Sequence, residues 1–338
     1  MKTLRTILNG ISGMTTGSLF SSGGGWEIGA VRAGMRPIWG VEYEKDRCDL
    51  WNRTFPTGRC INADVGDVAE NLKLLTPVDI LFTSPVCRDY SAAQTRVAQV
   101  NACRPKLGLF TLDYVAALRP KVVMLENVTG YKKDEEFRVY AQIVEGMLGL
   151  GYDHKEAILD AAYFGNPSYR KRLFAVFVLK GSGFKFKFPA APLMTKLKTW
   201  DDTTRPLWPS MPQSPPADSQ TRSLADLQSI GEMPEYPILF VSQSMQTIND
   251  RNNYVVPHGR PAPTLTQAKG LSSWRIGLSP TDTRKLTAEA ALRLNGFLVP
   301  GKFPSEYGRN SSTTLVFNIV GDAVSPIMAE ALLSGLTR

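Results

Sequence analysis

The sequence predicts an α/β protein with an open sheet and a small loop-rich region inserted late in the chain. Short apolar runs alternate with helical patterns over residues 16–180. The first run leads into a glycine-rich turn and a helix, an arrangement typical of nucleotide-binding sheets. Reactive or acidic residues follow several of the runs, and ligands of open α/β sheets bind beyond the carboxyl ends of the strands.

Composition indicates an intracellular protein with an anionic partner. The 338 residues are 43% hydrophobic and 21% charged, which is enough to form a full core. The formal net charge of +8 favours a polyanion. The four cysteines form no CxxC pair and no zinc spacing, and no secretory signal is present, so we expect a reduced cytoplasmic protein without a metal. We expect no run long and apolar enough to cross a membrane, and no membrane association.

The first predicted strand covers residues 16–21, and a helix through Ala33 follows its glycine turn. Glycines allow a ligand to approach the backbone, although glycine clusters also form ordinary loops. A second strand, residues 37–41, ends at Glu42, where ribose hydroxyls are often held, and Tyr43 is suited to cover an adenine ring. Asp64 is suited either to a base edge or to capping a helix over residues 65–75.

A candidate nucleophile follows the apolar run at residues 78–82. Pro85 ends this strand and places Cys87 in the loop beyond it. The alternative is a buried, unreactive cysteine. Residues 88–108 carry four cationic side chains, which indicates either a lid that closes on a polyanion or a solvated loop.

A candidate acid follows the next strand, residues 122–125. Glu126 and Cys87 would therefore face one cleft from the ends of two strands. Helices are expected at 109–118 and 137–150, and a strand pair at 157–161 and 173–178. Between the paired strands, Arg170 and Arg172 alternate on an extended segment and would point to one side, unless they form only a surface patch.

The chain changes character at Gly181. A short strand at residues 184–188 is followed by many prolines and few helical periods up to residue 237. We therefore expect three segments: a catalytic and cofactor domain at 1–180, a small domain at 181–258, and a return to the first domain at 259–338.

Several motifs, in this order, resemble those of the cytosine-5 DNA methyltransferase family. They are Pro85-Val86-Cys87, Glu126-Asn127-Val128, Arg170-Lys171-Arg172 and the segments 260–266, 284–297 and 320–324. The resemblance runs from about residue 16 to the C-terminus, apart from 181–258. It implies a doubly wound, Rossmann-like S-adenosylmethionine-dependent methyltransferase sheet, with the small inserted segment as the target-recognition domain.

The resemblance implies a DNA (cytosine-5-)-methyltransferase acting on a cytosine flipped out of double-stranded DNA. Cys87 would add to carbon 6 of the ring and make carbon 5 nucleophilic. Glu126, kept protonated by burial, would hold ring nitrogen 3, and Arg172 with Arg170 would hold the ring carbonyl and a nearby phosphate. The residues expected to contact DNA are Arg88, Ser91, Arg96 and Arg260.

The resemblance also implies a cofactor pocket for S-adenosylmethionine. Its expected residues are Phe20, Ser21, Ser22, Gly23, Gly24, Gly25, Glu42, Tyr43, Asp64, Val65, Pro85, Asp322, Ala323 and Val324. We further expect a monomer in the bacterial nucleoid or a phage-infected cell, with a cognate restriction endonuclease as a candidate partner.

The chain departs from the family pattern at several positions. Serine stands at 18 and 22 in place of the usual aspartate and glycine, and Ser168 replaces glutamine. The nucleophile loop reads Pro-Val-Cys-Arg where the family usually has Pro-Pro-Cys-Gln. Asp322 replaces asparagine and places a negative charge beside the expected cofactor pocket.

Three alternatives stay open on the sequence. Thr83-Ser84-Pro85 resembles the start of the cytosine-N4 methyltransferase signature, but Cys87 occupies its aromatic position. The departures also allow a weakly active or inactive DNA-binding relative. A transfer-RNA methyltransferase of the same family usually carries Cys-Phe-Thr shortly after Glu-Asn-Val, where this chain has residues 129–132 of different type.

Overall fold

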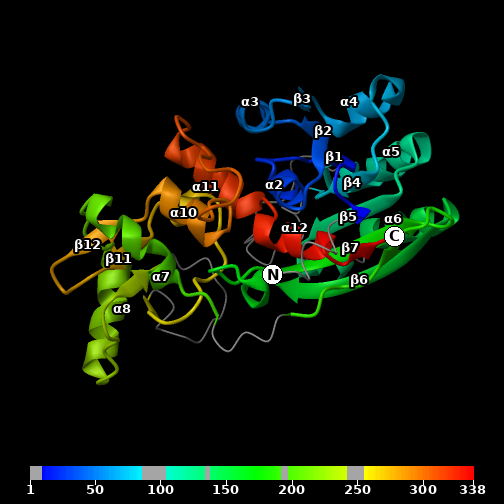
Figure 1. Ribbon diagram of the computed structural model, residues 1–338. Helices are drawn as coiled ribbons and strands as arrows, with labels where there is room; N and C mark the ends of the chain where they lie inside the picture. Colours follow the sequence, from blue (N-terminus) through cyan, green and yellow to red (C-terminus); the bar gives the residue numbers. More distant parts are fainter. Residues whose placement is uncertain (1–9, 86–103, 134–137, 192–196, 242–254) are drawn as a thin grey trace.

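The computed structural model describes residues 10–85, 104–133, 138–191, 197–241 and 255–338 (Figure 1). The predicted nucleophile Cys87 lies outside the described residues, as do Arg88, Ser91 and Arg96.

A seven-stranded sheet forms the centre of the molecule, in the order β3-β2-β1-β4-β5-β7-β6 (Figure 1). Strands β1 to β5 pair in parallel, and β7 runs antiparallel to both β5 and β6. The chain moves outward from β1 in one direction and from β4 in the other, so the topological switch point lies between these two strands. The strands are β1 Thr15–Leu19, β2 Arg36–Glu42, β3 Arg59–Asn62, β4 Ile80–Thr83, β5 Val122–Asn127, β6 Tyr152–Asp160 and β7 Lys171–Leu179.

Apolar side chains cover both faces of this sheet, as continuous apolar strands require. In β4, Ile80 and Phe82 pack with α2 (Gly25–Arg32) and α12 (Pro326–Leu333). Leu81 points the other way, towards α5 (Phe110–Leu118) and α6 (Val139–Gly149). Helices therefore cover both faces, and the predicted α/β doubly wound class is confirmed.

Two local predictions were wrong. The helix expected over 65–75 is α4 Val65–Ala69 followed by a 3-10 turn Leu72–Leu74, because Asn71 leaves helical geometry at φ −141°. The inserted region, expected to have few helical periods, contains the twelve-residue helix α8 Asp218–Ser229. Gln220 starts this helix by accepting from the Ala217 amide at 2.9 Å, and Leu227 is buried beneath it.

A second, antiparallel sheet has the order β10-β9-β11-β12. Its strands are β9 Ile238–Phe240, β10 Val255–Pro257, β11 Arg275–Gly277 and β12 Thr283–Lys285. Two of them, β11 and β12, lie beyond residue 258, in the segment expected to return to the large domain. The three-segment division stays a proposal. Strand β8 Lys185–Phe186 pairs with β13 Leu336–Thr337 beside the large sheet.

The remaining helices join the two sheets through one apolar cluster. The large side chains buried in it include Trp51, Trp274 and Phe317. The helices are α3 Lys45–Thr54, α7 Trp200–Thr204, α9 Ala268–Leu271, α10 Ala288–Leu294 and α11 Thr313–Asp322. Further 3-10 turns cover Arg104–Leu109, Thr129–Lys133, Ala161–Phe164 and Arg205–Ser210.

One stretch of the described chain, Thr313–Leu333, is long and apolar enough to cross a membrane, with mean hydropathy 1.4. The expectation that no run would meet this criterion was therefore wrong. The stretch comprises α11 and α12, which are separate helices, and 61% of its apolar 18-residue window is buried inside the protein. Its apolar character is that of core helices.

Candidate active site

A cavity of about 460 Å³ opens at the switch point of the large sheet. It is lined by Glu126, Arg170 and Arg172 and by most of the expected cofactor residues. These are Phe20, Ser21, Ser22, Gly25, Glu42, Tyr43, Asp64, Val65, Pro85, Asp322, Ala323 and Val324. The fold thus gathers the predicted acid, both arginines and the predicted cofactor residues around one space.

The glycine turn serves packing as much as ligand approach. A Cβ on Gly23 would lie 2.2 Å from the Tyr307 hydroxyl, and one on Gly25 would lie 2.2 Å from the Val324 carbonyl oxygen. Gly24 has φ +83°, which favours glycine. Gly25 lines the cavity, whereas Gly23 and Gly24 are not among its lining residues. The proposed cofactor role of these two stays a prediction.

The acidic tip of β2 is held by backbone amides. Glu42 is 8% exposed, and its carboxylate accepts from the amides of Ser22 at 2.7 Å and Glu44 at 2.8 Å. Burial raises the pKa of Glu42, against these hydrogen bonds and the nearby charge of Arg47. Next to it, the Tyr43 ring is 70% exposed and forms one wall of the cavity.

Both sequence interpretations of Asp64 fit the structure. Its carboxylate caps α4 by accepting from the Gly66 amide at 2.8 Å, and its side chain also lines the cavity. Val65 is buried beside it, and its carbonyl accepts from the Tyr114 hydroxyl at 2.8 Å.

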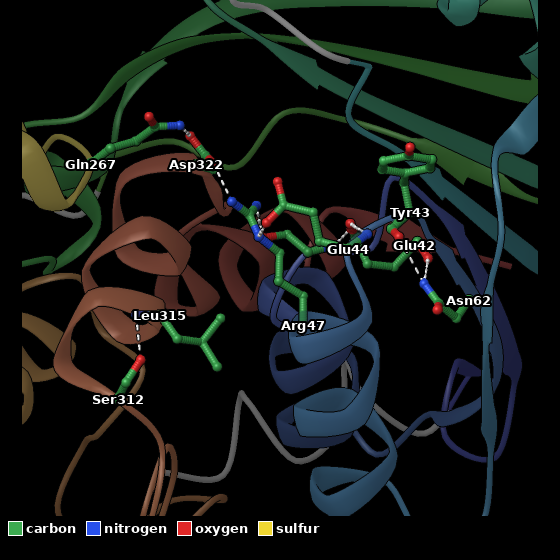
Figure 2. Close-up of polar contacts among 10 residues, drawn as sticks. Glu42, Tyr43, Glu44, Arg47, Asn62, Gln267, Ser312, Leu315 and Asp322 are labelled. Atoms are coloured by element: carbon green, nitrogen blue, oxygen red, sulfur yellow. Dashed lines mark hydrogen bonds and ion pairs between the residues drawn. The ribbon is translucent and has the colours of Figure 1, made fainter.

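The sequence reading missed Arg47, a buried guanidinium of α3 that lines the cavity (Figure 2). It donates to Asp322 Oδ2 at 2.8 Å and to Ser22 Oγ at 3.1 Å, and its Nε lies 3.1 Å from Glu44 Oε2. Burial alone would lower the pKa of Arg47, but the carboxylates around it raise it. An arginine in a polar helix gives no signal of this role, because its partner is 275 positions away.

Asp322, at the end of α11, joins three parts of the chain. Its second oxygen accepts from Gln267 Nε2 at 2.7 Å (Figure 2). Arg170 donates to the carbonyl oxygens of Gly321 and Asp322, each at 3.1 Å, and is 3% exposed. Arg170 therefore lies against the carboxyl end of α11, where a cation is favoured. Its contacts indicate that it positions the Asp322 loop.

Glu126, expected at the end of its strand, forms an ion pair with Arg172. Arg172 Nε lies 3.2 Å from Glu126 Oε1, and the Glu126 side chain is 5% exposed. Asn127 fixes the neighbouring loop, since its amide donates to the Pro85 carbonyl at 3.1 Å. Pro85 is the last described residue before Cys87, so this contact holds the start of the predicted nucleophile loop beside Glu126.

A buried carboxyl lies beneath the pocket at one of the departures from the family pattern. The Ser18 hydroxyl donates to Glu27, and Trp51 Nε1 donates to the same oxygen at 2.9 Å. Ser18 also contacts the hydroxyl of Ser21, a lining residue, at 2.7 Å. Burial raises the pKa of Glu27. Helix α2 therefore supplies an acidic group next to Ser18.

The remaining predictions concern DNA and metals. Arg260 is exposed, and its carbonyl accepts from the Trp200 amide at 2.9 Å. Its contact with DNA stays a prediction. Within the described ranges, no group of three or more His, Cys, Asp or Glu residues is arranged to hold a metal ion.

A doubly wound sheet with a cavity at its switch point, and an acid–guanidinium pair in that cavity, defines a Rossmann-like α/β protein with a ligand site at the carboxyl ends of its strands. Comparison with known proteins names the family. The model of the C-5 cytosine-specific DNA methylase family matches residues 14–338, and this chain belongs to that family. The predicted family and enzyme class are confirmed, and the cytosine-N4 alternative is not favoured.

Individual relatives agree with the family assignment. The chain is 24% identical over 325 residues to the Type II methyltransferase M.NgoFVII of Neisseria gonorrhoeae, covering 91% of this chain and 82% of the relative. It is 30% identical over 190 residues to M1.HphI of Haemophilus parahaemolyticus, where the match spans 54% of this chain and half of the relative (50%). The structure of the S. pombe Dnmt2 methyltransferase superposes with a TM-score of 0.63 at 15% identity, covering 95% of this chain and 97% of that one, which shows the shared fold.

Proposed function

We propose that this protein methylates carbon 5 of a flipped-out cytosine in double-stranded DNA, with S-adenosylmethionine as methyl donor. The observation that carries the proposal is a cavity lined both by the proposed catalytic residues and by the proposed cofactor residues. Glu126 and Arg172 lie at one side of it, and Glu42 and Asp64 at the other. A cofactor and a base bound in this space would meet without further rearrangement of the sheet.

The lining residues suit the proposed cofactor. Tyr43 presents an exposed ring for adenine, and the carboxylates of Glu42 and Asp64 are acceptors for ribose and the adenine amino group. Ser21, Ser22 and Gly25 would lie along the methionine end. When bound, S-adenosylmethionine supplies an electrophilic methyl group on a positively charged sulfur.

The chain's own residues would activate the base. The Cys87 thiolate adds to carbon 6, and the displaced ring electrons are stabilised at nitrogen 3 by Glu126 and at the ring carbonyl by Arg172. Carbon 5 thereby becomes nucleophilic. The methyl group that the cofactor supplies would be transferred to carbon 5. A base would then take the carbon-5 proton, and the freed electron pair would reform the ring double bond and expel Cys87 as the thiolate. Arg88, Ser91, Arg96 and Arg260 are proposed to bind the DNA.

Covalent trapping tests the proposal. DNA containing 5-fluorocytosine should form a stable adduct with the protein when S-adenosylmethionine is present, because fluorine cannot leave carbon 5 as the proton does. Cys87→Ala should abolish the adduct and the turnover while retaining DNA binding. Cys103→Ala, a cysteine in the same predicted loop, is the control and should still form the adduct. Turnover by Cys87→Ala would disprove the mechanism.

The product identifies the reaction. Hydrolysed DNA from cells expressing the protein should contain 5-methylcytosine by mass spectrometry. N4-methylcytosine in its place would establish the other class of cytosine methyltransferase. The Type II relatives support a role beside a cognate restriction endonuclease, which digestion of unmethylated and methylated DNA by products of neighbouring genes would test.

A further inference from the structure

The further inference concerns Arg47 and Asp322, two charged groups of the cofactor side to which the proposed chemistry gives no role. Arg47 lines the cavity with three carboxylates near it, those of Asp322, Glu44 and Glu42 (Figure 2). Its side chain is 7% exposed, and that of Asp322 is 29% exposed. Water therefore screens Arg47 and Asp322 less than it would on an open surface, whereas the Glu44 side chain is 47% exposed and more fully screened.

The four groups do not cancel. Three carboxylates against one guanidinium leave two negative charges at this wall of the cavity when all are ionised. The geometry holds the charges in place, since Arg47 is tied to α11 through Asp322 and to the glycine turn through Ser22. Asp322 is tied on its other oxygen by Gln267.

The proposed cofactor changes its charge during the reaction. S-adenosylmethionine carries a sulfonium and an ammonium against one carboxylate, and loss of the methyl group removes the sulfonium charge. A wall with excess negative charge stabilises the first form more than the second. We propose that Arg47 and Asp322 set the preference of this pocket for the cationic methyl donor over its neutral demethylated product, S-adenosylhomocysteine. This inference rests on the proposed function.

Single substitutions should move the preference in opposite directions. Asp322→Asn leaves one net negative charge at the wall and Arg47→Gln leaves three, whereas the double variant restores two. The double variant breaks the ion pair but keeps neutral side chains able to hydrogen-bond. The expected order of preference for the methyl donor is Arg47→Gln above the native protein and the double variant, with Asp322→Asn lowest.

Isothermal titration calorimetry of each full-length variant gives a dissociation constant for S-adenosylmethionine and one for S-adenosylhomocysteine. The preference is the dissociation constant of S-adenosylhomocysteine divided by that of S-adenosylmethionine. Removing or adding one charge at the cavity wall should change this ratio by about fivefold to tenfold. If Arg47 and Asp322 had only a structural role, the substitutions would weaken the binding of both compounds equally and leave the ratio unchanged. That result would overturn the inference. If Arg47→Gln does not fold, Asp322→Asn and the double variant still test the inference. Asp322→Asn should lower the ratio, and the double variant should keep the native ratio.

The same titrations separate this inference from the proposed function. Failure of the native protein to bind either compound would refute the proposed cofactor. Binding of both compounds with one common ratio in all variants would refute only the charge effect.

Discussion

The two sides of the cavity are built in different ways. Glu126, Asn127 and Pro85 come from the ends of β4 and β5, which are neighbours in the sheet. The cofactor side is assembled from α3, the glycine turn and the end of α11, joined by Arg47 and Asp322. Strand pairing alone places the first set, whereas the second needs long-range packing. The reactive side should therefore lose chemistry when altered, and the cofactor side should lose affinity and stability.

The largest expected effect sharpens this comparison on the reactive side. Glu126→Gln should lower kcat by about 10²–10⁴-fold, because the amide is a far weaker proton donor to the ring. The free energy of unfolding should change little, since the side chain keeps its size and its place beside Arg172. Steady-state methylation and urea unfolding measure the two effects. Glu145→Gln, an exposed control, should match the native rate. A large loss of stability in Glu126→Gln would instead make it a structural residue.

Arg170→Met tests whether that arginine belongs with the cofactor side. The change removes the hydrogen bonds to the carbonyls of Gly321 and Asp322, whose oxygens are partly buried. The free energy of unfolding should fall by about 2–4 kcal/mol, measured by urea titration, and cofactor affinity should fall with it. Arg260→Met, at an exposed position, should leave stability unchanged and weaken DNA binding only. A fully stable Arg170→Met with lost DNA binding would move Arg170 to the reactive side.

Gly25→Ala tests the packing of the glycine turn against Val324. The new Cβ would lie 2.2 Å from the Val324 carbonyl oxygen, so the backbone must shift. We expect a loss of about 1–3 kcal/mol in stability, with weaker cofactor binding. Gly149→Ala is the matched control: it lies in α6 with open space around it and should stabilise the protein by about 0.5–1 kcal/mol. Equal effects at both positions would show that the close approach has no cost.

Tyr43→Ala separates affinity from stability within the cofactor side. The ring is 70% exposed, so its removal should leave thermal unfolding unchanged. Cofactor affinity should fall by about tenfold, because the adenine loses an aromatic platform. Calorimetric titration measures the loss, with Tyr163→Ala, also exposed, as the control. Unchanged affinity would remove Tyr43 from the proposed pocket.

The smallest effect concerns Glu27 beneath the turn. Burial raises its pKa above the ordinary value of 4.5, so its stabilising contribution is full below pH 4.5 and is lost as pH rises through the folded-state pKa. Glu27→Gln has no such proton to lose. It should therefore lose less stability than the native protein between pH 5 and pH 8. Urea unfolding at the two pH values checks this, and identical slopes would contradict the burial argument.

The sequence by itself determined the family, the sheet and the neighbouring strand ends that carry Pro85 and Glu126. Apolar runs followed by Pro85 and Glu126 predict neighbouring strand ends, because parallel strands deliver their carboxyl ends to one edge. The same logic placed Glu42 at the tip of β2. These relations are local in the chain or follow from sheet topology.

Only the tertiary structure decided the partners of the charged groups. Arg47 meets Asp322, Arg170 meets the end of α11, and Ser18 meets Glu27. Side-chain pairing across elements depends on how helices pack, and neither periodicity nor spacing encodes it. The negative charge of Asp322, which the sequence left unexplained, is matched by a guanidinium buried through that packing.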